Sequence, residues 1–260
     1  MASKLEWVRI FVSIVTRAIR RLRHYAWFIR VRAKNEAFDL LIGLFNLYVR
    51  VRAGLRSSGV IYIVGDSHSR SFRYRYPIIV DHFGGSTAHN LISDKSVTNS
   101  REKLSKVVDR VNWSRDCLVL VFGEIDCRQH VYRSIESQDP NGDVHSIVDS
   151  TIERYFSAVR EINDASRKLM VCGVPPAADG VDEKTTPVYG SLDKRQEITR
   201  LFNETLERES SKLGVGFLDV YSLVTDDNGA TAGKFRHDGV HLSRELSKAT
   251  MGTIRRYWQS

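Results

Sequence analysis

Two short polar motifs, one after the first apolar run of the globular region and one near the C-terminus, hold residue types that could act together in catalysis. The first is Gly-Asp-Ser-His-Ser at residues 65–69, which directly follows the apolar run Val60–Val64. A serine on a tight turn after a strand can present its hydroxyl above a sheet edge, and its own N–H can point toward a developing oxyanion. Ser67 is therefore a candidate nucleophile, although Gly-Asp-Ser alone also occurs in ordinary turns.

The second motif, His-Asp-Gly-Val-His-Leu-Ser at residues 237–243, supplies a carboxylate and an imidazole three positions apart. With this spacing, Asp238 can meet one nitrogen of His241 while the other nitrogen faces Ser67. The carboxylate would fix the tautomer and stabilise the imidazolium that forms when Ser67 loses its proton. The alternative is a surface turn with two polar residues. We predict a catalytic triad of Ser67, Asp238 and His241.

These motifs resemble the first and last blocks of the SGNH (GDSL-type) hydrolases, which are Gly-Asp-Ser after a strand and Asp-x-x-His before the C-terminal helix. The resemblance covers roughly residues 59–257. It implies a serine esterase or acyltransferase that requires no cofactor and no metal, and the eight histidines show no metal-ligand spacing. It also implies an oxyanion-hole glycine after the second strand, which is Gly85 or, alternatively, Gly84; Ser67 would contribute a second N–H.

A third motif, Gly-Glu-Ile-Asp-Cys-Arg at residues 123–128, departs from the family pattern Gly-x-Asn-Asp. Ile125 stands where the family asparagine would donate to the oxyanion, and an isoleucine side chain has no donor. Arg128 could replace it as a cationic donor, or could form an Arg–carboxylate pair that only fixes the loop. We also assign Glu124 and Asp126 to substrate binding. With Gly-Asp-Ser-His-Ser, this motif resembles a divergent SGNH branch associated with bacterial surface polysaccharides.

The elements that must position these motifs alternate between apolar runs and helical stretches. Five runs are predicted strands: Val60–Val64, Ile78–Phe83, Leu118–Phe122, Leu169–Val174 and Val215–Val220. Four helices are predicted at Arg101–Val111, Ser146–Ala165, Leu192–Lys212 and Ser243–Trp258, the last capped by Ser243. Strands apolar on both faces and alternating with helices indicate a mostly parallel sheet covered on both sides. We predict an α/β fold, a three-layer α/β/α sandwich with the flavodoxin-like strand order 2-1-3-4-5, with the motifs at the carboxyl ends of the strands.

The N-terminal residues 1–57 differ from the rest in charge. They carry twelve Lys or Arg against three acids, whereas the remaining residues hold 27 basic and 28 acidic side chains, so the net charge of +8 belongs to this segment. Its apolar residues recur at helical spacing, which predicts two or three amphipathic helices. We predict a helical extension at 1–57 joined near Gly54–Gly59 to a catalytic domain at 58–260.

This basic segment suggests where the protein acts. Aromatic and basic residues on amphipathic helices favour an anionic membrane surface, and packing on the catalytic domain or on a second subunit is the alternative. No uncharged apolar run reaches the roughly 20 residues of a membrane span, and Arg9 interrupts any secretory signal. We expect a cytoplasmic protein, peripheral at the inner membrane face. Because the catalytic body is not basic, we expect no nucleic-acid partner.

The leading functional hypothesis is acyl chemistry, most simply with acetyl esters, on a carbohydrate or polysaccharide. Water would resolve the acyl-serine in an esterase, and a sugar hydroxyl would do so in an O-acyltransferase, for which acetyl-CoA is a candidate donor. Ile125 supports a different class, a catalytically degenerate binding or scaffold protein in polysaccharide assembly. The three cysteines (Cys117, Cys127 and Cys172) are predicted to be small core residues, and a reducing compartment fits them.

Overall fold

The computed structural model of the chain describes residues 36–138, 143–179, 181 and 186–260. The chain divides into two compact units, Met1–Leu47 and Tyr48–Ser260. A helix over residues 36–55 contains the described part of the first unit and continues into the second. The helices predicted before residue 36 lie outside the described residues, and the predicted boundary between residues 57 and 58 stays a prediction.

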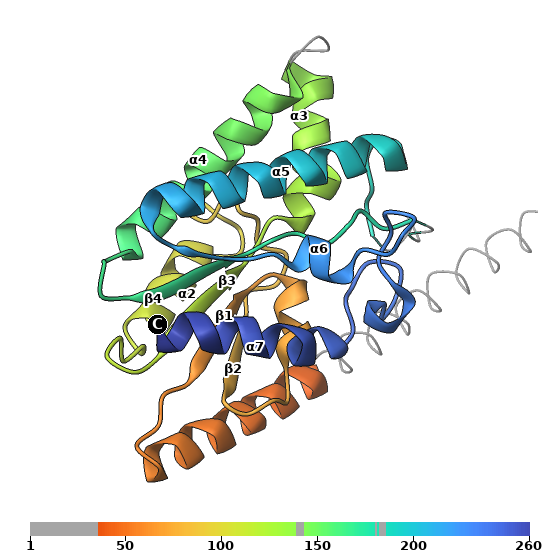
Figure 1. Cartoon of the computed structure of the whole chain (residues 1–260). Coiled ribbons are helices and arrows are strands. Elements are labelled where there is room, and N and C mark those ends of the chain that lie inside the picture. The colour runs from red at the N-terminus through yellow and green to blue at the C-terminus, as the bar shows by residue number, and fades with distance from the viewer. Residues whose placement is uncertain (1–35, 139–142, 180, 182–185) are drawn as a thin grey trace, which may run out of the picture. The chain divides into compact units, whose positions relative to one another are not determined.

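Five parallel strands form the central sheet of the second unit, in the spatial order β2-β1-β3-β4-β5 (Figure 1). The strands are β1 (Ile61–Gly65), β2 (Ile78–His82), β3 (Cys117–Val121), β4 (Lys168–Cys172) and β5 (Gly216–Leu218). Every residue of β1 and β3 is buried, as expected for central strands covered on both faces. The predicted α/β class, parallel sheet and strand order are confirmed.

Helices flank this sheet. They are α2 (Ser100–Val108), α3 (Val131–Gln138), α4 (Val144–Ile162), α5 (Leu192–Leu213), α6 (Val220–Val224) and α7 (Glu245–Gln259), with short helices η1 (Ser67–Phe72), η2 (Asp126–His130) and η3 (Gly233–Phe235). Figure 1 shows α3, α4 and α5 gathered on one side of the strands. There α4 packs against both α3 and α5, whereas α7 packs against β5 and η1.

Local capping explains where several elements begin and end. Ser191 accepts the N–H of Lys194 at the start of α5, and Gly214, with φ of +65°, ends that helix in the left-handed region. The fifth strand is shorter than predicted because Asp219 accepts the N–H of Ser222 and starts α6 there. Arg244, not Ser243, occupies the N-cap position of the last helix. The Ser243 hydroxyl still accepts the N–H of Glu245 at 3.3 Å and donates to the Lys234 carbonyl.

The segment between residues 126 and 138 is helical, which the sequence analysis did not predict. It begins with the π-helix η2 directly after the third motif and continues as α3. The mostly polar residues there hide the helical period. The three cysteines are free and buried, which confirms their prediction as core residues. Among the described residues, no helix is long and apolar enough to cross a membrane.

Candidate active site

Ser67 lies at the first residue of η1, immediately beyond the carboxyl end of β1. The approach to this turn requires glycine at position 65, because a Cβ there would lie 1.9 Å from the carbonyl oxygen of Val121. Asp66 then caps η1 by accepting the backbone N–H of His68 at 2.8 Å. This strand–turn–helix path brings the Ser67 hydroxyl to the carboxyl edge of the sheet.

The side chains of Ser67, His241 and Asp238 form one continuous hydrogen-bonded chain. His241 Nε2 lies 2.9 Å from Ser67 Oγ, and His241 Nδ1 lies 2.8 Å from Asp238 Oδ2. The Asp238 carboxylate also accepts the backbone N–H groups of Val240 and His241, both at 2.7 Å, which holds it in the tight 238–241 turn. The structure therefore brings together the three residues predicted as a triad, although Ser67 and His241 are 174 positions apart.

The environment of Asp238 favours its ionised form. Partial burial alone would raise the pKa of this carboxyl, but the N–H donors of His241 and Val240 and the imidazole hold its pKa below the usual range. An ionised Asp238 accepts a hydrogen bond from His241 Nδ1–H, which leaves the lone pair of Nε2 facing Ser67. The side chains of His241 and Asp238 are 35% and 51% exposed, so solvent reaches them directly.

Two side chains on η1, neither assigned a role from the sequence, fasten the loop that carries His241. His68 Nε2 lies 3.2 Å from the carbonyl oxygen of Val240, and the Ser71 hydroxyl donates to the carbonyl of Leu242 at 2.7 Å. These carbonyls belong to the residues on either side of His241. We call His68 and Ser71 the η1 clamp. These two residues are three positions apart, which places them on one face of a 3₁₀ helix. That spacing was the only feature of the sequence that could have indicated their shared role.

His68 is charged at neutral pH. It is only 3% exposed, and burial alone would lower its pKa, but the Asp66 carboxylate, 3.6 Å from His68 Nδ1, outweighs burial and raises the pKa to about 9. A protonated imidazole donates from both nitrogens, so His68 Nε2–H can donate to Val240 while Nδ1–H faces Asp66. The His68 and His241 ring centroids lie 5.4 Å apart.

The two glycines considered for the oxyanion hole follow β2. Gly84 has φ of +73°, a conformation that favours glycine, whereas Gly85 is exposed and has no such constraint. A Cβ on either residue would meet nothing within 4 Å in the chain itself. Gly85 opens onto a hollow next to its loop. Its N–H, together with that of Ser67, stays the predicted donor pair.

Arg128 forms an ion pair with a carboxylate, which is one of the two alternatives that the sequence left open for it. Its Nε and Nη2 donate to the two carboxylate oxygens of Glu124 at 2.5 and 3.1 Å, and its Nη1 donates to the Pro187 carbonyl. The side chains of Arg128 and Glu124 are only 12% and 13% exposed. Each guanidinium nitrogen thus already has a protein acceptor, and Glu124 is likewise occupied by the arginine.

Asp126 holds the loop after β2 and offers no surface to a ligand. It is completely buried, and its two carboxylate oxygens accept the N–H groups of Ala88 at 2.7 Å and His89 at 3.1 Å. Burial raises the pKa of this carboxyl to about 7 although the two N–H donors lower it. The sequence-based assignment of Asp126 to substrate binding is therefore corrected: its carboxylate positions residues 88 and 89.

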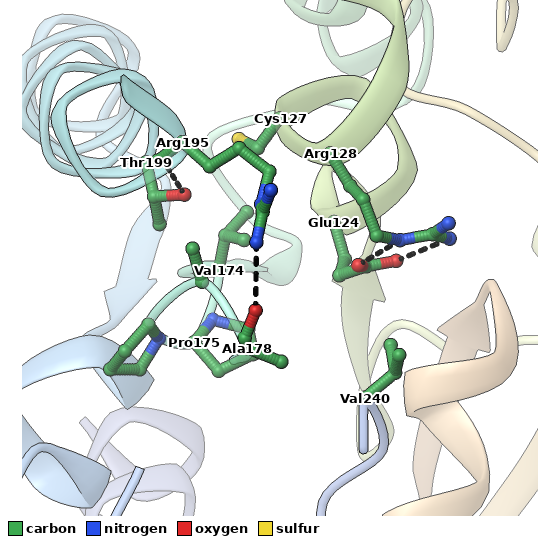
Figure 2. Close-up of a pocket in the computed structure, with 11 residues that line it drawn as sticks. Glu124, Cys127, Arg128, Val174, Pro175, Ala178, Arg195, Thr199 and Val240 are labelled. Atoms are coloured by element: carbon green, nitrogen blue, oxygen red, sulfur yellow. Dashed lines mark hydrogen bonds and ion pairs between the residues drawn. The ribbon is translucent and has the colours of Figure 1, made fainter. Parts of the chain in front are cut away.

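A pocket lies between the loops that follow β3 and β4. Figure 2 shows the Glu124–Arg128 pair on one side of it and Arg195 on the other, where Arg195 donates to the Ala178 carbonyl at 3.0 Å. Val240, the neighbour of His241, lines the same pocket. An adjoining hollow, which also includes Ala178 and Val240, contains Asp238 and His241. In the part of the chain that the structure describes, no cluster of three His, Cys, Asp or Glu side chains could hold a metal ion.

Known structures share the five-stranded parallel α/β fold of this chain. The chain is similar to the carbohydrate acetylesterase family member from Sinorhizobium meliloti, with 16% identity over 77% of this chain and 100% of that one, and a TM-score of 0.51. It is equally similar to a GDSL-like lipase from Bacteroides thetaiotaomicron, with 16% identity over 84% of this chain and 98% of that one, and a TM-score of 0.51. No protein-family model and no curated protein sequence matches this chain. The chain has the fold of the SGNH (GDSL-type) hydrolases.

Proposed function

We propose that this protein is a serine-dependent esterase that removes a small acyl group, such as acetyl, from a carbohydrate. The observation that carries the proposal is the hydrogen-bonded chain from Asp238 through His241 to Ser67 at the carboxyl edge of the sheet. Ser67 Oγ attacks the ester carbonyl carbon as its proton passes to His241 Nε2. The tetrahedral intermediate then collapses, the sugar oxygen takes the proton from His241, and an acyl-serine remains.

Hydrolysis completes the cycle in this proposal. Water attacks the acyl-serine carbonyl, gives one proton to His241, and releases the carboxylic acid as Ser67 Oγ takes that proton back. The exposure of His241 and Asp238 supports this outcome, because transfer to a sugar hydroxyl requires an acyl-enzyme protected from water. An acyltransferase that uses a donor such as acetyl-CoA shares the same first half-reaction and is the proposal's nearest variant.

The size of the pocket in Figure 2 supports a small acyl group. Val174, Pro175, Ala178 and Val240 line it, and its free volume is about 20 Å³. That volume is close to the roughly 10–15 Å³ needed by one water molecule, so in this proposal the pocket would take the methyl group of an acetyl ester and not a long acyl chain. The fold shared with a carbohydrate acetylesterase family member supports the carbohydrate part of the proposal.

The engagement of Arg128 favours a second candidate, a catalytically degenerate binding or scaffold protein in polysaccharide assembly. The family's asparagine donor is replaced by Ile125, and Arg128 is held by Glu124 and Pro187 instead of being available to an oxyanion. Loss of one oxyanion donor costs about 10²–10³ in kcat, which slows an enzyme without abolishing it. The two candidates therefore differ in whether Ser67 reacts at all.

A fluorophosphonate probe and 4-nitrophenyl acetate separate these candidates. The wild-type chain should be labelled at Ser67 and should hydrolyse the ester, whereas Ser67→Ala should lose labelling and about 10⁴-fold or more of the turnover. Asp238→Asn should reduce turnover less than His241→Ala does, because the base survives while its orientation degrades. Ser69→Ala, two positions from the nucleophile, controls for probe selectivity: its labelling should persist. If the probe does not label the wild-type chain at Ser67, the second candidate, a binding or scaffold protein, is supported instead.

A further inference from the structure

Another polar hollow is lined by the segment that connects β2 to α2 and by His130 at the end of η2. Its volume is about 200 Å³, and Gly85, Asn90, Lys95, Thr98 and His130 are among its lining residues. This volume is below the roughly 300–1,000 Å³ of pockets that hold drug-sized ligands, so it suits a single small unit. Gly85 lines this hollow, and with Gly85 as the predicted oxyanion donor a group attached to the reacting ester would extend toward it.

Three of the lining side chains have polar groups that no other described residue engages. The Lys95 ammonium makes no ion pair within the described residues. The Asn90 side-chain oxygen meets His89 Nδ1 at 3.2 Å, which leaves the Asn90 amide donors unmatched among them. The His130 ring stacks on His89 with centroids 6.5 Å apart and has no hydrogen bond to the described chain. Donors that converge on a concave surface without protein acceptors indicate a place for a polar ligand.

The charge of the hollow narrows the ligand class. Burial, followed by the nearby His89 and Arg133, lowers the pKa of His130, so its imidazole is neutral at pH 7. The neighbouring carboxylate of Asp94 is engaged by Arg101 at 3.0 Å. Lys95 therefore supplies the one positive charge among the lining residues, with hydroxyls from Thr87, Ser96 and Thr98 around it. A single ammonium matches a ligand with one negative charge.

We propose that this hollow binds a sugar ring bearing one carboxylate, a uronate, with Lys95 facing the carboxylate and Asn90 and His130 facing ring hydroxyls. The inference deepens the proposed function, on which it rests, by naming the glycan class from which the acyl group is removed. A phosphate is the less suitable anion, because proteins hold its higher charge with several donors or a bidentate arginine and the hollow offers one lysine.

Matched probes that differ only at the sixth carbon test the charge selectivity. The full-length protein is assayed with mono-O-acetylated methyl glucuronoside, the corresponding methyl glucoside and the methyl glucoside 6-phosphate. We expect kcat/KM to be about fivefold higher for the uronide than for the glucoside, the upper range of an exposed ion pair. Lys95→Gln should abolish this preference. Lys106→Gln, an exposed lysine on α2 paired with Glu102, is the matched control and should retain it.

A binding measurement separates failure of this inference from failure of the proposed function. In Ser67→Ala protein, calorimetric titration with methyl glucuronoside should show binding that is weakened by salt and lost when Lys95→Gln is added. If that binding appears although the wild-type protein does not hydrolyse esters, the hollow is a uronate site and the esterase proposal fails. If wild-type protein hydrolyses esters with equal kcat/KM for uronide and glucoside, the inference is overturned and the esterase proposal stands. A preference for the phosphate over the uronide overturns the carboxylate assignment.

Discussion

At the scale of single residues, the nearly enclosed pair of Arg128 and Glu124 shows how burial changes the value of an ion pair. Arg160 and Glu153 on α4 make a bidentate pair of similar geometry, with both contacts at 2.9 Å, but their side chains are 41% and 59% exposed. Water screens the exposed pair, whereas removal of one partner from an enclosed pair leaves an uncompensated charge. The two pairs therefore form a natural comparison within one chain.

We expect Arg128→Met to lower the free energy of unfolding by about 2 kcal/mol or more, because Glu124 loses its partner in a site that is 13% exposed. Arg160→Met should change it by no more than about 0.5 kcal/mol. Urea unfolding of both variants provides the comparison. The kcat of Arg128→Met on 4-nitrophenyl acetate should stay within a few-fold of wild type. A hundredfold loss of kcat with unchanged stability would instead make Arg128 an oxyanion donor.

His68 should make the stability of the fold depend on alkaline pH. Its folded-state pKa of about 9 lies above the unfolded value of about 6.5, so its contribution is fully present below pH 6.5 and is lost as pH rises through 9. The difference amounts to about 3 kcal/mol at most. Urea unfolding at pH 6.5 and 10 should show a steeper loss for wild type than for His68→Gln. The exposed His145→Gln variant should lose stability as wild type does.

The residues that the sequence could place are those whose partners are local or whose motif is diagnostic. Asp238 and His241 are three positions apart, so their contact follows from a single turn, and the Gly-Asp-Ser motif marks the position of Ser67. Asp126 could not be interpreted in this way, because its acceptor role depends on N–H groups 37 and 38 positions earlier in the chain. The same holds for His68, whose partner Val240 is 172 positions away.

At the scale of elements, η1 has two functions: it presents Ser67 at its first residue and fastens the 238–242 loop through the η1 clamp. The proposed nucleophile, Ser67, and the proposed base, His241, thus lie on two segments that are hydrogen-bonded to each other outside the proposed triad. A misplacement of about 1 Å in a catalytic group can cost about 10²-fold in rate. The clamp therefore acts as a positioning device, and its effect should appear in kcat.

Ser71→Ala tests this device. The change removes the hydrogen bond to the Leu242 carbonyl and should lower kcat about tenfold with little change in KM, because the loop that carries His241 loses one of its two fasteners. Ser157→Ala on α4 is the control, since the Ser157 hydroxyl bonds only groups of its own helix, the Glu153 carbonyl and the Arg160 guanidinium, at an exposed position. Steady-state kinetics on 4-nitrophenyl acetate distinguishes the outcomes. A rise in KM at constant kcat would contradict a positioning role.

The periodicity of the sequence predicted the strands and the long helices because their apolar residues face one core. It failed where a polar group decides the boundary. Asp219 ends β5 early by capping α6. At α7 the N-cap position belongs to Arg244, while the Ser243 hydroxyl bonds both the Lys234 carbonyl and the N–H of Glu245. The helical segment formed by η2 and α3 was also missed. It begins within the third motif, and its mostly polar residues hide the spacing of apolar residues that would predict a helix.

At the scale of the whole molecule, the helix over residues 36–55 carries apolar residues on two faces. Val49 and Ala53 are buried. Opposite them, within an arc of about 120° at 100° per residue, lies an exposed apolar stripe. We define the stripe as Leu40, Leu41, Leu44 and Leu47, each at least 55% exposed. An exposed apolar surface of this kind marks an interaction site. It belongs to the segment 1–57 with its twelve basic residues.

We propose that this stripe lies on an anionic membrane surface, where apolar side chains enter the interface and each nearby basic residue contributes about 1 kcal/mol. The full-length protein should pellet with phosphatidylserine-containing vesicles but not with neutral phosphatidylcholine vesicles, and less in high salt. Leu40→Gln combined with Leu44→Gln should weaken this binding strongly. Leu223→Gln, which alters an exposed leucine of α6 outside the stripe, should not.

Point variants are preferable to truncation here, because a chain beginning at Ser58 would lose the buried side chains of Val49 and Ala53 and could unfold for that reason alone. The measurement also separates the membrane from a second copy of the chain as the occupant of the stripe. Light scattering of the same variants reports the oligomeric state without lipid. A full-length protein that ignores anionic vesicles and forms a dimer, which Leu40→Gln and Leu44→Gln together dissociate, would place a subunit interface on the stripe and refute the membrane proposal.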